Sequence, residues 1–181
     1  MRIRYNAPVI LTFSLLAMLI LILSATLWPR LAQQYFTVSG YVNWSSIADW
    51  FRLFSHPLGH AGWAQLTSNL AFILLLGPLL EARYGSWRLL LLMLLTALAS
   101  GLLNVLLFKA GLMGASGIAF MLILLAAMDD LRAGIVPLTF ILLAIIFLGH
   151  EVTLALRDNF AQLALLGGGV VGAVFGLLLR R

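Results

Sequence analysis

The sequence contains no cysteine and very little charge. Without cysteine, the chain of 181 residues forms no disulfide and offers no thiol for catalysis or metal binding. Charged residues make up 9% of the chain and hydrophobic residues 63%, whereas a soluble domain is roughly a quarter charged and half apolar. The scarcity of charge therefore excludes an ordinary soluble domain and predicts an all-α membrane protein that crosses the bilayer several times.

The formal net charge of +5 comes without a basic patch. Lysine and arginine stand singly near the ends of apolar runs, so we expect no nucleic-acid surface. No carboxylate or second histidine has metal-ligand spacing inside these runs, so we expect neither a metal nor a cofactor. The bilayer itself is the partner that the composition predicts.

Six charge-poor runs are long enough to cross a bilayer, which takes about 20 apolar residues in a helix. Most of their connections are short, which predicts one domain over residues 1–181, and no charged residue lies inside any run. The runs are Ala7–Trp28, Ala61–Leu80, Leu89–Phe108, Ala110–Met128, Ala133–Gly149 and Asn159–Leu179.

The segment Leu31–His60 differs from these runs because it is aromatic and mixed in polarity. We expect a long loop in the membrane interface, where amphipathic aromatic side chains are enriched, carrying short amphipathic helices such as Ser45–Phe54. An ordinary ordered loop is the alternative. The aromatic residues are Tyr35, Phe36, Tyr41, Trp44, Trp50, Phe51 and Phe54.

The distribution of basic residues predicts the orientation. With the N-terminus inside, seven of the 11 lysine and arginine residues fall in inner segments and four in outer ones, which favours N-in and C-in. We therefore expect a multi-pass protein of a bacterial-type inner membrane, with the aromatic loop and His150 on the outer side.

Two polar motifs mark the predicted spans. Gly114-Ala115-Ser116-Gly117 is either a notch for close helix packing or an exposed nucleophile flanked by glycine. Gln65 and Asn69 are four residues apart and share a helix face, where they either bond to a neighbouring helix or donate to a reacting oxygen. Gly168, Gly172 and Gly176 repeat every four residues and predict close contact with another helix.

These motifs, in this order, resemble the rhomboid family of intramembrane serine proteases. His60, Gln65 and Asn69 fall on the family's His-x4-His-x3-Asn pattern, and Gly114-Ala115-Ser116-Gly117 on its Gly-x-Ser-Gly motif. Glu81 and Gly85 match its Glu-x3-Gly turn, and Arg52 matches the arginine of its Trp-Arg pair, with Phe51 in place of tryptophan. The end of the chain from Asp158 resembles the family's last helix, where a glycine stripe follows Ala-His.

The resemblance implies a rhomboid-like bundle of six transmembrane helices with the aromatic loop between the first two. It implies Ser116 as the nucleophile, with Asn69, Gln65, His60 and Gly114 on the oxyanion and binding side. Structural roles fall to another set of matching residues. These are Arg52, Glu81, Gly85, Gly168, Gly172 and Gly176.

Two departures from the family pattern concern catalysis directly. The position of the family's base, a histidine three residues before the first stripe glycine, is Leu165 here. The second histidine of the second-span pattern is Gln65, which donates a hydrogen bond but takes up no proton. Gln162 also stands where many relatives carry histidine.

Counting along the spans predicts that no other base reaches Ser116. Ser116 and Leu165 each lie seven residues past an outer charge, roughly 10 Å deep in a helix. His150 should lie a turn or two shallower, with Glu151 beside it to orient it, and His60 should lie at the interface. A base has to come within about 3 Å of the hydroxyl.

The favoured hypothesis is a pseudoprotease that binds transmembrane segments of other proteins. Resemblance to inactive relatives such as derlins implies a role in quality control or trafficking. The alternative is an active serine endopeptidase that uses His150 or His60 as an unconventional base. A transporter or channel is disfavoured, because such proteins line their paths with intramembrane charges or broken helices.

Overall fold

The chain folds into a helical bundle, and the computed structural model describes residues 5–132, 134–156 and 162–179. Within these residues no strand forms, and one isolated bridge pairs Val38 with Leu112. The main helices are α1 (Pro8–Thr26), α4 (Trp63–Tyr84), α5 (Ser86–Leu103), α6 (Ser116–Arg132), α7 (Leu138–Ala155) and α8 (Gln162–Leu179). The shorter ones are α2 (Leu31–Tyr35), α3 (Ile47–Ser55), the 3-10 turn η1 (His56–Leu58) and the π-helical turn η2 (Asn104–Phe108).

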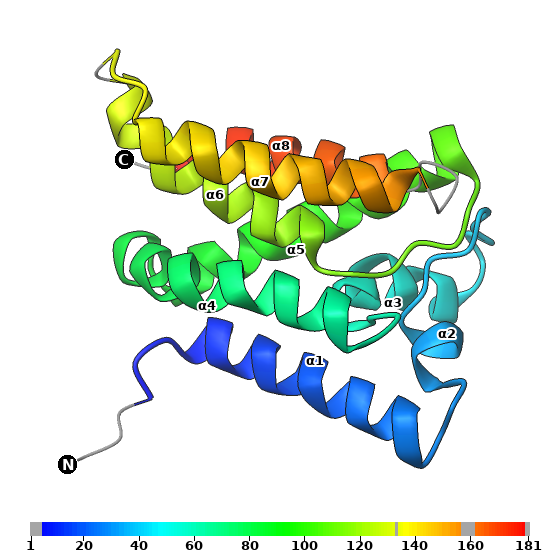
Figure 1. Cartoon of the computed structure of the whole chain (residues 1–181). Helices are drawn as coiled ribbons and strands as arrows, with labels where there is room; N and C mark the ends of the chain where they lie inside the picture. Colours follow the sequence, from blue (N-terminus) through cyan, green and yellow to red (C-terminus); the bar gives the residue numbers. More distant parts are fainter. Residues whose placement is uncertain (1–4, 133, 157–161, 180–181) are drawn as a thin grey trace.

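The main helices run back and forth across the bundle (Figure 1). The start of α1 and the end of α8 lie at one end, while α2 and α3 lie at the other. Gly85 makes the tight turn between α4 and α5, with a φ of +83° that favours glycine.

Four helices are long and apolar enough to cross a membrane, and two apolar helices are shorter. The four are α1, α4, α5 extended through η2, and α8, while the shorter apolar segments are Ser116–Met128 and Leu138–Thr153. An all-α membrane protein is thus confirmed, and six crossings remain a prediction.

The fourth predicted run begins later than the sequence suggests. Helix α6 starts at Ser116 and not at Ala110, because the chain before it is held in a non-helical path. Lys109 adopts a left-handed φ of 52°, and the backbone of Leu112 exchanges two hydrogen bonds with Val38. The predicted run from Ala110 therefore begins as a non-helical segment and becomes helical only at Ser116.

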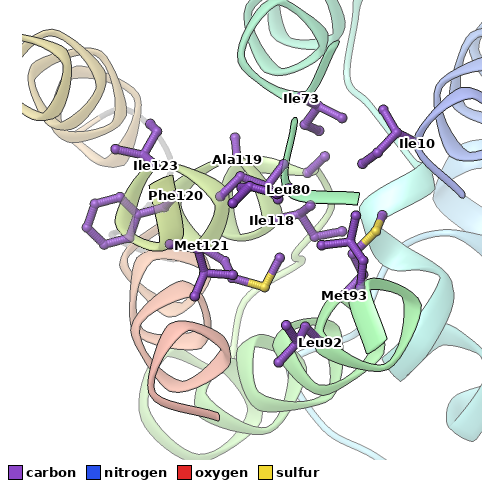
Figure 2. Packing of buried hydrophobic residues seen from close by; sticks show 14 of the residues in the cluster. Ile10, Ile73, Leu80, Leu92, Met93, Ile118, Ala119, Phe120, Met121 and Ile123 are labelled. Carbon is purple, nitrogen blue, oxygen red and sulfur yellow. The ribbon is translucent and has the colours of Figure 1, made fainter. Parts of the chain in front are cut away.

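Helix α6 is the centre of the hydrophobic core. From Ser116 to Ile123 every side chain is buried, and a helix that is apolar on all sides belongs inside a bundle. Its core residues belong to one hydrophobic cluster with side chains from α1, α4 and α5 (Figure 2). The labelled contacts include Ile118, Ala119, Met121 and, from the surrounding helices, Ile10, Ile73, Leu80, Leu92 and Met93.

The glycine stripe of α8 packs inside the bundle. A Cβ atom at Gly168 would overlap Ser100, and one at Gly172 would overlap Thr96, both on α5. A Cβ atom at Gly176 would lie 2.6 Å from Leu125 of α6. The stripe therefore brings α8 against α5 and α6, as small residues do between membrane helices.

Glu81 of α4 holds the beginning of α1. Its two carboxylate oxygens accept hydrogen bonds from the backbone N–H groups of Val9 and Ile10, both at 3.0 Å. Ser86 donates a third bond at 2.7 Å. Since the first N–H groups of a helix have no partner within it, this buried carboxylate satisfies donors that α1 itself leaves free.

Candidate functional site

Ser116 is the first residue of α6, and the segment before it is held in place by Gly114. The N–H of Gly114 donates to the carbonyl of His56 at 3.0 Å, and the φ of Gly114 is +125°. A Cβ atom at Gly114 would also lie 2.6 Å from Nε2 of Gln65. The backbone angle therefore favours glycine at this position, and Ser116 ends up fully buried.

Gln65 supports the segment before Ser116. Its Nε2 donates to the carbonyl of Met113 at 3.3 Å, while its Oε1 accepts from the N–H of Ala61 at 2.9 Å. Both ends of this amide are therefore engaged with backbone. In this structure Gln65 fixes the loop and does not direct its donor at the Ser116 hydroxyl.

The Ser116 hydroxyl lies between two polar side chains from other helices. Its Oγ is 3.2 Å from Oδ1 of Asn69 on α4 and 3.0 Å from Oε1 of Glu151 on α7. A serine hydroxyl carries one proton, so it donates to only one of two acceptors at a time. The contact joins three helices through one buried oxygen.

Asn69 separates His60 from the serine. The Nδ2 group of Asn69 lies 3.4 Å from Nε2 of His60, whose Nδ1 lies 3.3 Å from the carbonyl of Leu58. This pattern fits a neutral ring that donates from Nδ1 and accepts at Nε2. Burial lowers the pKa of His60 to about 4, although its bond to Leu58 works in the opposite direction.

The His60 side chain is buried within the protein, and its depth relative to the membrane interface stays a prediction. His56, on the 3-10 turn that precedes it, is buried as well. Its Nε2 lies 3.0 Å from the carbonyl of Ala97, and burial lowers its pKa to about 4. Both rings are neutral at physiological pH and serve as hydrogen-bonding groups of the aromatic segment.

The sequence analysis named Glu151 only as a group that orients His150 and missed its contact with Ser116. Glu151 is 1% exposed, in contact with Ser116, and not a turn or two shallower as expected. The depth count failed for both residues, because it treated the stretches from Lys109 to Ser116 and from Arg132 to His150 as helix, whereas α6 begins at Ser116 and α7 at Leu138. The fifth predicted run ends at Gly149, whereas α7 continues as one apolar helix and includes Glu151. The return of mostly apolar residues after Glu151 is the sequence signal that could have shown this.

His150 meets Glu151 and not the serine. Its Nδ1 lies 3.5 Å from Oε1 of Glu151, and its side chain is 44% exposed. Glu151 therefore stands between the half-exposed ring and Ser116. Neither His150 nor His60 reaches the hydroxyl directly in this structure.

Leu165 lies beside the start of α6 in an apolar cluster. The cluster contains Val38, Leu53, Leu112 and Ala164, and the Leu165 side chain is buried in it. The carbonyl of Leu165 closely approaches Gly117, since a Cβ atom there would lie 2.7 Å from it. Leu165, which the resemblance aligns with the family's base, thus lies beside Gly117 and presents a hydrocarbon side chain.

Arg52 lies away from Ser116 and joins two short helices. Its Nε donates to the carbonyl of Gln34 in α2 at 2.9 Å, and its guanidinium pairs with Asp49 within α3. Among the residues that the structure describes, no three histidine, cysteine or carboxylate side chains gather as a metal site would require.

Comparison with known families identifies the fold that holds this site. A family model described as the rhomboid domain matches residues 48–181. The chain belongs to the rhomboid family. The match begins at Ala48 within α3 and includes every residue around Ser116. A search of curated proteins finds no match.

The rhomboid assignment confirms the family resemblance that the motifs carried. It covers α4, α6 and α8, on which Asn69, Ser116 and Leu165 stand. Family membership sets the architecture, but the chemistry depends on the side chains present at each position.

Proposed function

We propose that this rhomboid-family membrane protein binds transmembrane segments of other membrane proteins without cleaving them. The observation that supports this proposal is the set of groups around Ser116. Among the described residues, its hydroxyl has Asn69 and Glu151 as hydrogen-bond neighbours, and no imidazole nitrogen. We also propose that the N- and C-termini face inward, so that this end of α6 faces the outer side.

The chemistry of amide hydrolysis explains why the neighbours of Ser116 decide the matter. A serine becomes a good nucleophile when a positioned base takes its proton, and that base has to lie within hydrogen-bond reach. His60 is separated from the hydroxyl by Asn69, and His150 by Glu151. Loss of one member of such a constellation leaves roughly 10³–10⁴-fold acceleration over water, which is too little for useful peptide hydrolysis.

The fold supports binding in spite of this loss. The glycine stripe holds α8 firmly against α5 and α6, while the outward face of α7 is apolar and exposed. Helix association within a bilayer depends on packing and on interhelical hydrogen bonds, because lipid is as apolar as the helix surface. The exposed apolar face of α7, with buried polar groups close by, could therefore bind a transmembrane helix.

The proposal is tested with purified protein and a single-pass transmembrane substrate that active rhomboid proteases cleave. We expect no cleavage product, together with crosslinking of the substrate to the intact protein. Cleavage that disappears in Ser116→Ala would overturn the proposal. Absence of crosslinking in bilayers would also count against it.

A second candidate function rests on the contact between Ser116 and Glu151. A carboxylate 3.0 Å from a hydroxyl is within the range at which a general base acts, so an endopeptidase with Glu151 as base is the active alternative. A fluorophosphonate probe separates the two candidates. The active alternative expects labelling that is lost in both Ser116→Ala and Glu151→Gln but retained in His150→Ala, whereas the binding function expects no labelling at all.

A further inference from the structure

Glu151 has one carboxyl oxygen engaged and one free. Oε1 lies 3.0 Å from Oγ of Ser116 and 3.5 Å from Nδ1 of His150. Oε2 is buried and has no hydrogen-bond partner among the residues that the structure describes. A buried acceptor without a partner is costly, and more so when the group can carry charge.

The surroundings of Glu151 offer no water to offset that cost if the helix lies in a bilayer as proposed. Glu151 belongs to an apolar helix and is 1% exposed. Ionisable groups in such a setting mark binding sites or transport paths by default, because they are otherwise selected against. The free oxygen therefore indicates a partner group that arrives from outside the chain.

We infer that Glu151 recognises a lysine or arginine side chain in the transmembrane segment of the bound protein, an inference that rests on the proposed binding function. A basic residue within a client helix is itself poorly solvated by lipid. Pairing it with Glu151 satisfies both buried groups in one contact, with the cation donating to Oε2. Charge complementarity thus selects the ligand class.

The position of Glu151 on α7 shows how such a side chain would approach. Glu151 follows Phe147 by four residues and shares its helix face, where Phe147 packs edge-on against Phe72 of α4 at 5.3 Å. Ile145 and Ile146 lie on the opposite, exposed face of α7. A client helix would lie beside the edge of α7 that carries His150, whose side chain is 44% exposed and lies 3.5 Å from Oε1 of Glu151. From there a long basic side chain would extend to the carboxyl group with its stem buried against apolar residues.

The hydrogen-bonding capacity and charge of other residues at the same position of the client helix predict how tightly each would bind. A leucine at the same position offers no donor, and asparagine offers a donor without charge. A glutamate would place a second acidic group beside the first and be rejected, since like charges disfavour each other at short range. We therefore expect binding to weaken from lysine through asparagine and leucine to glutamate.

The test uses the full-length protein in nanodiscs with a fluorescent single-span polyleucine peptide, either unsubstituted or carrying one lysine in its outer half. We expect the lysine peptide to bind about tenfold more tightly than the leucine peptide, which corresponds to about 1.4 kcal/mol. Glu151→Gln should remove the preference, and Glu151→Asp should retain part of it. Asp49→Asn removes a carboxylate from α3, away from α7, and should leave the preference unchanged.

Charge reversal distinguishes recognition from loss of folding. In Glu151→Lys, a peptide with glutamate should bind more tightly than one with lysine, a gain that a misfolded protein would not produce. Equal binding of lysine and leucine peptides to the wild type would overturn the inference while leaving the proposed function intact. Failure of every peptide to bind would overturn the proposed function, and the inference with it.

Discussion

Two buried glutamates on apolar helices have opposite surroundings in this molecule. Glu81 accepts three hydrogen bonds, from the N–H groups of Val9 and Ile10 and from the hydroxyl of Ser86. Glu151 has one oxygen near Ser116 and His150 and the other without a partner among the described residues. The difference teaches that burial alone does not define a structural carboxylate, because only the first is fully compensated by the fold.

The two glutamates should therefore differ in what their removal does to stability. Glu81→Ala leaves two backbone N–H groups of α1 buried without a partner, so we expect a loss of about 3 kcal/mol. The measurement is the free energy of unfolding in mixed micelles titrated with a denaturing detergent. A loss below about 1 kcal/mol would contradict the view that Glu81 holds the start of α1.

The glycine stripe provides the next largest expected effect. Gly168→Ala places a methyl group on Ser100 of α5, and overpacking of this kind costs about 2 kcal/mol. Gly149→Ala in α7 is the matched control, since nothing lies within 4 Å of a Cβ atom there and alanine favours the helix. We expect the first variant to melt at a lower temperature than the wild type and the second at the same or a higher one.

Acidification tests the buried histidines on the other side of Ser116. The pKa of His56 and His60 is about 4 in the folded chain, against about 6.5 in an unfolded one. Between these values the unfolded state binds more protons, so stability falls as the pH is lowered through this window. From pH 7 to 5.5 we expect a loss of about 1 kcal/mol for each ring.

The matched variant for this prediction is His60→Gln. It lacks one of the two titrating rings, so its stability should depend on pH about half as steeply as that of the wild type. Thermal melts at a series of pH values measure the slope. An unchanged slope would mean that His60 is charged in the folded protein near pH 6.

The smallest expected change in the free energy of unfolding is that of Glu151→Gln, which is compared directly with that of Glu81→Ala. Glu151→Gln keeps the shape of the side chain and can keep a hydrogen bond with Ser116, so we expect a change within about 1 kcal/mol in either direction. The same micelle titration used for Glu81 measures it. A loss as large as that of Glu81→Ala would assign Glu151 a structural role and remove the contrast.

Much of the site could be located from the sequence. The remaining part could not, because it depends on where the helices begin and end. Ser116, Asn69 and Leu165 stand in a motif order that predicts their helices. Glu151 was placed too shallow, because the count assumed helix from Lys109 to Ser116 and from Arg132 to His150, whereas α6 begins at Ser116 and α7 at Leu138. The non-helical path before Ser116 depends on the pairing of Leu112 with Val38, which is remote in the sequence.

The sequence by itself determined the membrane class, the helical architecture and the rhomboid family, because hydrophobic runs and closely spaced motifs are local properties of the chain. Only the tertiary structure decided which side chains meet at Ser116. That hydroxyl touches residues 47 and 35 positions away, Asn69 and Glu151, and the distances follow from the registration of three helices against one another. The register of one helix against another depends on packing across the whole bundle, so no local sequence pattern specifies it.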